Sequence, residues 1–118
     1  MTDIVDTNAL KASQAGMRLV AQTFLYNVGK EDRLRQFLSE AYADDLLAQQ
    51  PADAKTAAFL HMRRVVGRLK IKQVLGIDPH QVVALMQAER LPDGFIIELK
   101  VHADYPHKIV YYMQRPLE

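Results

Sequence analysis

The sequence predicts a single α+β domain, in which amino-terminal helices pack on an antiparallel sheet of about four strands. Between residues 8 and 66, apolar residues recur at spacings of three and four, as in a helix with one buried face. Between residues 67 and 116, apolar and polar residues alternate, as in a strand with one buried face. Turn-forming residues divide this second half into short segments, which favours a meander of neighbouring strands.

The first helix is expected over residues 8–28. Thr7 and Asn8 have short polar side chains that can bond the free amide groups of a first turn. Gly29 follows at a position where helices commonly end in the left-handed conformation. One helical stripe then contains the apolar residues Leu10, Met17, Val20, Ala21, Phe24, Leu25 and Val28.

A second helical pattern covers residues 34–47, and Asp32 is placed to help cap it. The stretch 43–45 interrupts the pattern, so both one long helix and two short helices fit the sequence. Pro51 ends this region, because proline has no amide hydrogen and restricts the conformation of the residue before it.

The third helix is expected over residues 54–66, with Asp53 as its cap and Gly67 at its end. A first strand is expected over residues 68–75, because apolar residues alternate with lysines from Leu69 onward. The chain therefore passes directly from a helix into the sheet.

Residues 78–91 fit either a helix or a strand. The pair Asp78–Pro79 is typical of a helix start, with Asp as the cap and Pro in the first turn. The residues that follow can equally be divided between two strand faces by simple alternation. Residues 91–94, Leu-Pro-Asp-Gly, are typical of a tight turn, and a tight turn suits a hairpin. We therefore expect a strand before the turn at 91–94.

The last two strands have the most regular patterns. They are expected over residues 95–102 and 108–114, with a break at Asp104–Pro106 between them. In the first of these strands, every second residue from Phe95 to Val101 is apolar and lies on one face.

The composition limits the cellular location and the binding partners that can be expected. The chain has no cysteine, so neither a disulfide framework nor a thiolate metal site is expected. Residues 1–6 lack the basic start and the apolar run of a secretory signal. No apolar run approaches the roughly 20 residues that cross a membrane. We therefore expect a cytoplasmic protein without a membrane partner.

Three stretches of the sequence carry a family resemblance. They are the helix 59–67, which ends in Val-Val-Gly and passes into Leu69-Lys-Ile, the strand–turn–strand unit Val82–Val101, and the run from Lys108-Ile109 through an aromatic strand to Arg115-Pro116. On these stretches the chain resembles the nuclear transport factor 2-like superfamily, also called the SnoaL-like or cystatin-like cone. The match is closest to its small domains of unknown function. The resemblance implies one domain over residues 1–118, with a curved sheet wrapped around a helix.

The resemblance also implies a cone-shaped cavity that binds a small apolar or amphipathic molecule, or a partner protein, without catalysis. The expected inner wall consists of Met17, Phe24, Phe59, Met62, Met86, Ile97 and Leu99. No cofactor is expected, because the chain has no glycine-rich phosphate loop. The histidines, His61, His80, His102 and His107, lack the spacing of metal ligands, so no metal site is expected.

The alternative function is that of an isomerase or hydratase of the ketosteroid isomerase-like class. Such chemistry needs a carboxylate base and a hydroxyl or neutral acid donor that face one cavity. Tyr26 and Tyr111 are the candidate donors. Alternation places Glu98 and His102 opposite the apolar face of their strand, away from the interior, so the sequence identifies no base.

Apolar residues also occur on the second face of the expected sheet. This outer face is expected to contain Val83, Leu85, Ile96, Val110 and Tyr112. An exposed apolar sheet usually meets a partner. Because members of the superfamily commonly pair sheet to sheet, we expect a two-fold homodimer through this face.

A second alternative is a winged-helix protein that binds nucleic acid. Residues 61–72 contain five basic residues and no acidic one: Arg63, Arg64, Arg68, Lys70 and Lys72. If residues 78–91 were helical, three helices and the last hairpin would resemble a winged helix, with this basic run on the phosphates. The net charge of +1 is too balanced to favour this alternative, so nucleic acid is not an expected partner.

Overall fold

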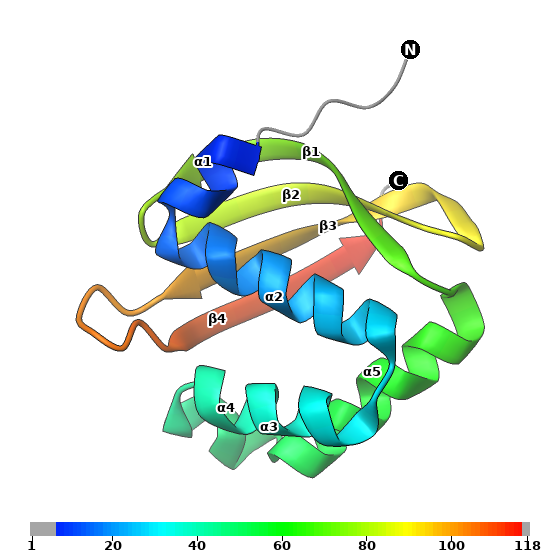
Figure 1. The fold of residues 1–118 in the computed structure, drawn as a ribbon, viewed down its shortest axis with the longest axis horizontal. Helices are drawn as coiled ribbons and strands as arrows, with labels where there is room; N and C mark the ends of the chain where they lie inside the picture. Colours follow the sequence, from blue (N-terminus) through cyan, green and yellow to red (C-terminus); the bar gives the residue numbers. More distant parts are fainter. Residues whose placement is uncertain (1–6, 117–118) are drawn as a thin grey trace.

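The computed structural model describes residues 7–116; residues 1–6, on which the expectation about a secretory signal rests, lie outside this range. Within it, helices precede a four-stranded antiparallel sheet, which confirms the predicted α+β class (Figure 1). The helices are α1 (Thr7–Ala12), α2 (Gln14–Val28), α3 (Glu31–Ala41), α4 (Asp44–Gln49) and α5 (Ala52–Val66). The strands are β1 (Leu69–Asp78), β2 (Gln81–Ala88), β3 (Leu91–Val101) and β4 (Ile109–Pro116).

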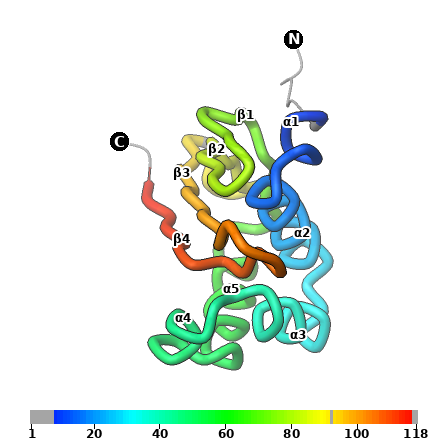
Figure 2. Tube along the Cα trace, turned by 90° about the vertical axis from the view of Figure 1, so that its left-hand side faces the viewer, coloured from blue at the N-terminus to red at the C-terminus, as the bar shows by residue number. Residues whose placement is uncertain are grey.

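The sheet is a meander, because each strand pairs with the next in the order β1-β2-β3-β4. It curves around α2, which crosses its inner face and contacts β1, β2 and β3 (Figure 1). The helices α3, α4 and α5 form a second group, beyond the β4 edge of the sheet (Figure 2). Within residues 7–116, no helix covers the opposite, outer face (Figure 2).

The inner face of the two central strands forms a filled core. The buried residues are Val82, Ala84 and Met86 of β2, and Phe95, Ile97 and Leu99 of β3. Their pairing agrees with this, since Ala84 lies opposite Ile97 and Met86 lies opposite Phe95. Residues 81–88 are therefore a strand, as expected. The winged-helix alternative is wrong, because it requires a helix at 78–91.

One continuous helix was expected over residues 8–28, but this expectation is wrong. The helix breaks at Ser13. Ser13 Oγ accepts a hydrogen bond from the Gly16 amide at 3.0 Å and donates one to the Asp78 carbonyl oxygen at 2.7 Å. A Cβ atom on Gly16 would lie 2.5 Å from the Leu10 carbonyl oxygen. The serine cap and this close approach let α1 fold back on α2. Helical spacing alone does not reveal such a break, because apolar residues continue across it.

The prediction of a tight turn at residues 91–94 is wrong. The turn between β2 and β3 lies at Glu89–Arg90, and residues 91–94 already belong to β3. The pairing of the two strands shifts between Met86 and Ala88, which marks a bulge. Gly94 has a φ of 84°, and a Cβ atom on it would lie 2.5 Å from the Met86 carbonyl oxygen. The Pro-Asp-Gly segment therefore distorts a strand instead of reversing the chain.

The region 34–47 forms two helices, and Tyr42 lies between them. Tyr42 makes a parallel bridge with Ile109 at the start of β4. The Ala43 amide donates a hydrogen bond to the Ile109 carbonyl oxygen at 2.8 Å. The interruption in the helical pattern therefore joins the second group of helices to the edge of the sheet.

The last helix begins two residues earlier than expected, at Ala52. Its cap is Pro51, and Asp53, the expected cap, lies in the first turn instead. An acidic side chain in a first turn still interacts favourably with the helix dipole. None of the helices within residues 7–116 is long and apolar enough to cross a lipid bilayer.

Candidate functional site

The seven residues expected to line one cavity lie in three different places. Met86, Ile97 and Leu99 are buried in the filled core between the sheet and α2. Met17 and Phe24 point outward from α2, with 38% and 62% of their surfaces exposed. Phe59 and Met62 of α5 line a hollow beside the sheet. Side chains therefore fill the centre of the expected cone. The hollow lined by Phe59 and Met62 lies at its margin.

The outward face of α2 is apolar. Met17, Val20 and Phe24 are exposed along one stripe of this helix. Together with Leu10, Lys11 and Ala21, they border a hollow of about 360 Å³. Among the described residues of this lining, Lys11 alone is charged, so the surface offers apolar contact but little that could orient a ligand.

The hollow that contains Phe59 and Met62 lies between α5 and β4, and we call it the aromatic pocket. Its volume is about 280 Å³. It is lined by Tyr42, Gln50, Lys55, Ala58, Phe59, Met62, Tyr112 and Gln114. These residues come from α5, from β4 and from the chain around α4. The pocket therefore forms only when the second group of helices packs beside the sheet.

Three rings form one wall of the aromatic pocket. Tyr112 packs edge-to-face against Tyr42, with 6.3 Å between ring centres, and against Phe59, with 6.1 Å. Phe59 packs in the same way against Tyr26, at 6.2 Å. Edge-to-face contacts fix the relative orientation of rings. The wall is therefore a pre-formed surface anchored to the core.

One lysine enters this aromatic wall. The Lys55 ammonium lies 4.8 Å from the centre of the Tyr42 ring and donates a hydrogen bond to Gln50 Oε1 at 3.3 Å. Burial lowers the pKa of Lys55. In the part of the chain that the structure describes, no carboxylate forms an ion pair with it. An ammonium group has three donors, so Lys55 keeps capacity to bind a ligand.

The two tyrosine hydroxyl groups at the aromatic pocket are bonded within the protein. Tyr42 donates to Gln22 Oε1 at 2.6 Å, and Tyr112 donates to Gln114 Oε1 at 2.9 Å. Burial raises the pKa of both tyrosines well above the ordinary value. Both hydroxyl groups are therefore protonated at neutral pH, and their hydrogen bonds hold the rings in place.

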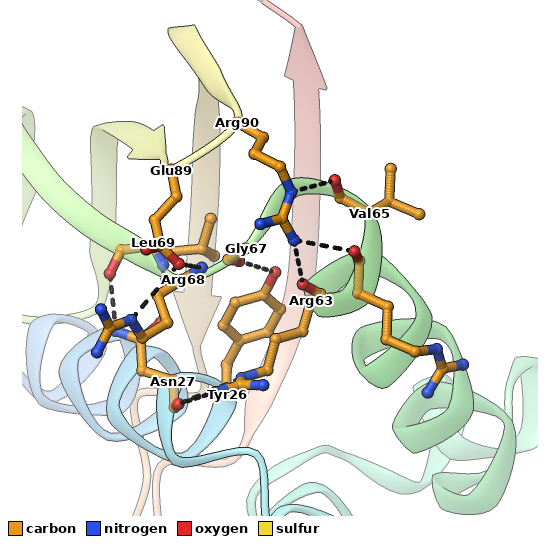
Figure 3. Close-up of polar contacts among 10 residues, drawn as sticks. Tyr26, Asn27, Arg63, Val65, Gly67, Arg68, Leu69, Glu89 and Arg90 are labelled. Atoms are coloured by element: carbon orange, nitrogen blue, oxygen red, sulfur yellow. Dashed lines mark hydrogen bonds and ion pairs between the residues drawn. The ribbon is translucent and has the colours of Figure 1, made fainter.

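A larger hollow, of about 760 Å³, lies at the carboxyl-terminal end of α2. Beside it α2, α5 and β1 meet in a set of polar contacts that we call the junction (Figure 3). Asn27 pairs with Leu69 as a neighbouring strand would: Nδ2 donates to the Leu69 carbonyl oxygen and Oδ1 accepts from the Leu69 amide, both at 2.7 Å. The Tyr26 hydroxyl donates to the Gly67 carbonyl oxygen at 2.8 Å.

Two arginines donate hydrogen bonds to backbone carbonyl groups at helix ends in the junction. Arg63 Nη2 donates to the Asn27 carbonyl oxygen at 2.9 Å, at the end of α2. Arg90 Nε donates to the Val65 carbonyl oxygen at 3.0 Å, at the end of α5 (Figure 3). The last carbonyl groups of a helix lack partners within it and carry a partial negative charge. The two guanidinium groups therefore stabilise the places where the chain leaves its helices.

The basic run at 61–72 is partly engaged in the same contacts. Arg63 caps α2, as described above. Glu89 Oε1 accepts from the Arg68 amide at 2.7 Å and lies 3.5 Å from the Arg68 side-chain Nε. These hydrogen bonds lower the pKa of Glu89. Part of the run that the winged-helix alternative assigned to phosphate binding thus stabilises the fold.

The candidate donors for isomerase chemistry lie away from the aromatic pocket. Tyr26 is 1% exposed, and burial raises its pKa to about 12. Tyr111 lies on the outer face of the sheet, with Lys100 Nζ 5.1 Å from its ring centre. Glu98 is also on the outer face, where alternation placed it, opposite Met113. The described residues that line the aromatic pocket include no carboxylate.

Three of the histidines gather at one end of the sheet. The rings of His80 and His107 stack at 6.0 Å, and His102 Nδ1 lies 3.8 Å from Asp104 Oδ2. Within residues 7–116, no group of three or more potential ligands is placed to hold a metal ion.

Sequence reasoning assigned two neighbouring tyrosines to the wrong faces of β4. Tyr112, expected on the outer face, lines the aromatic pocket, whereas Tyr111, considered as a donor into the cavity, points outward. The pairing of β3 with β4 shifts beside Tyr111 and leaves Val110 as an extra residue. One inserted residue exchanges the two faces of a strand. Simple alternation along the sequence contains no signal for this bulge.

Comparison of the chain with protein-family models, with curated proteins and with solved structures finds no match. The resemblance to the nuclear transport factor 2-like superfamily therefore stays a prediction.

Proposed function

We propose that this protein binds a small apolar or amphipathic molecule in the aromatic pocket and does not transform it. The observation that carries the proposal is the wall of mutually packed rings, Tyr42, Phe59 and Tyr112, beside one lysine. Sites for small molecules are typically concave and largely apolar, with a few polar groups that orient the ligand. Because hydrogen bonds already hold both tyrosines, little ordering is needed when a ligand binds.

Heteronuclear NMR titration with naphthamide, a neutral two-ring probe, tests this proposal. We expect saturable shifts of the backbone amides of Tyr42, Phe59, Met62 and Tyr112. The variant Met62→Trp fills the hollow and should abolish these shifts. Its control, Met17→Trp, places the same ring on the exposed face of α2 and should leave them unchanged. Shifts centred on α2, or no saturable shifts, would contradict the proposal.

The isomerase alternative has less support than binding alone. Its chemistry needs a carboxylate base within reach of the substrate. The described residues around the aromatic pocket provide a lysine, amides and tyrosines, but no such base. Tyr26 is bonded to Gly67 in the junction, and Tyr111 lies on the outer face.

The superfamily resemblance belongs to the same proposal. The order of helices followed by a curved meander around α2 supports it (Figure 1). A cytoplasmic location is part of this proposal as well, since a chain without cysteine needs no oxidising compartment.

We also propose a two-fold homodimer through the outer face of the sheet. Val83 and Leu85 of β2 and Ile96 of β3 are half-buried on this face. Within residues 7–116, no helix covers them (Figure 2). Both acidic and basic groups, including Glu98 and Lys100, lie on the same face. A surface that carries both charges can be complementary to a copy of itself.

Analytical ultracentrifugation at micromolar concentration tests the dimer. We expect the unmodified protein to sediment as a dimer and Leu85→Glu to sediment as a monomer. Phe24→Glu is the matched control, because it places the same charge on the exposed apolar face of α2. A monomeric unmodified protein, or dissociation by Phe24→Glu alone, would refute an interface on the outer sheet face.

A further inference from the structure

The charge of the aromatic pocket is one-sided. Lys55 is the one charged residue among those lining it, and the other polar groups are tyrosines and glutamines. Asp53, the acidic residue in the first turn of the same helix, is in an ion pair with Arg35. The pocket therefore has a positive group and no negative group in its described lining.

The position of Lys55 strengthens this asymmetry. The residue lies near the amino-terminal end of α5, where the partial charge of the helix dipole is positive. Its ammonium lies over the Tyr42 ring and bonds one neutral amide oxygen, that of Gln50. A carboxylate would add the attraction between opposite charges to such a hydrogen bond. A ligand carboxylate would therefore be a better partner for this ammonium than the neutral amide it now contacts.

We propose that the ligand of the aromatic pocket is a planar aromatic monoanion, whose carboxylate binds Lys55 and whose ring packs on Phe59 and Tyr112. This inference rests on the proposed function, because it specifies the ligand class for the same site. The ring wall supplies edge-to-face contacts for a planar group. Lys55 supplies the single charge that fixes its orientation.

The size of the site limits this ligand class. The hollow of about 280 Å³ is at the lower end of the roughly 300–1,000 Å³ that is typical of small-molecule sites. One ring or two fused rings with a short acidic group suit this space better than an extended lipid. Burial removes part of the water around the Lys55 ammonium and thereby lowers its pKa. A bound carboxylate would offset that loss of solvation.

Paired titrations with naphthoate and naphthamide test the inference, because the two probes have similar shape and differ in charge. We expect naphthoate to bind the protein roughly tenfold or more tightly than naphthamide, as one hydrogen bond between charged groups allows. Lys55→Gln should remove this preference, and Lys55→Arg should retain most of it. Arg64→Gln, which removes one exposed positive charge from the same helix, should leave the preference unchanged.

The outcomes separate the ligand class from the existence of the site. Equal binding of the two probes, with shifts at Phe59 and Tyr112, would overturn the monoanion inference and leave the proposed binding function intact. A preference for naphthoate that survives in Lys55→Gln would also overturn it. Failure of both probes to shift the pocket amides would overturn the inference and the proposed function together.

Discussion

Two hollows of this protein, the one beside the junction and the aromatic pocket, differ in how their polar groups are bonded. The hollow at the junction is the larger, at about 760 Å³, and the aromatic pocket measures about 280 Å³. At the junction, both ends of the Asn27 side-chain amide are bonded to the backbone of Leu69. In the aromatic pocket, Lys55 bonds one amide oxygen and retains further donors. Asn27 is thus fully engaged with the backbone, whereas Lys55 retains donors beside an aromatic wall.

The difference has a structural cause. At the junction the chain leaves two helices and enters a strand, so backbone groups lose their regular partners there. Asn27, Arg63 and Arg90 replace those partners. The aromatic pocket lies instead between side chains of the helix α5 and of β4, which pairs with β3. At the aromatic pocket, Lys55 therefore keeps donors that no backbone group of the described residues uses.

The largest expected effect on stability is that of Asn27→Ala. The substitution removes the side-chain partner of the Leu69 amide and of the Leu69 carbonyl group, and both of these hydrogen bonds are partly buried. We expect a loss of about 2–4 kcal/mol in the free energy of unfolding, since each unpaired group costs about 1–3 kcal/mol. Urea denaturation followed by circular dichroism measures it. Gln49→Ala, an exposed amide at the end of α4, should change little; equal losses in the two variants would contradict the role of the junction.

An intermediate effect is expected from Tyr26→Phe, which deletes the hydrogen bond to Gly67. At neutral pH we expect a loss of about 1 kcal/mol in the free energy of unfolding. The pH dependence should change as well. The pKa of Tyr26 rises from 10.0 to about 12 on folding, so its stabilising contribution is complete below pH 10 and is lost as the pH rises toward 12.

Thermal unfolding between pH 9 and pH 12 should therefore show a shallower alkaline loss of stability in Tyr26→Phe than in the unmodified protein. Tyr42 and Tyr112 also have raised pKa values, so some alkaline destabilisation should persist in the variant. Parallel stability curves for the two proteins would show that Tyr26 does not titrate differently in the folded and unfolded states.

The smallest expected effect on stability is that of Lys55→Gln. Burial disfavours the charged form of Lys55, and no carboxylate among the described residues compensates it. We expect a change of less than about 0.5 kcal/mol in the free energy of unfolding, as for ordinary partly exposed positions. The same variant should lose its preference for naphthoate. A loss as large as that of Asn27→Ala would place Lys55 among the structural groups and erase the contrast between the two hollows.

Much of the fold could be predicted because local patterns and tertiary packing agree. The third helix and the last two strands follow regular patterns and are all present, although β3 begins four residues before its expected start at Phe95. The ambiguous segment 78–91 contains a strand, as alternation indicated. The aromatic pocket was not predictable to the same degree. Nothing in the sequence distinguishes Lys55 from other helical lysines, and Tyr42 was expected within a helical stripe.

The fold class and the order of helices and strands can be inferred from the sequence, because burial of one face requires a period that is visible in the chain. The points at which that period is interrupted depend on tertiary contacts. Ser13 caps α2 and also bonds to Asp78, 65 residues away, and an extra residue at Val110 turns Tyr112 inward. Such contacts join distant segments, so no local pattern encodes them, and they determine which side chains reach the aromatic pocket.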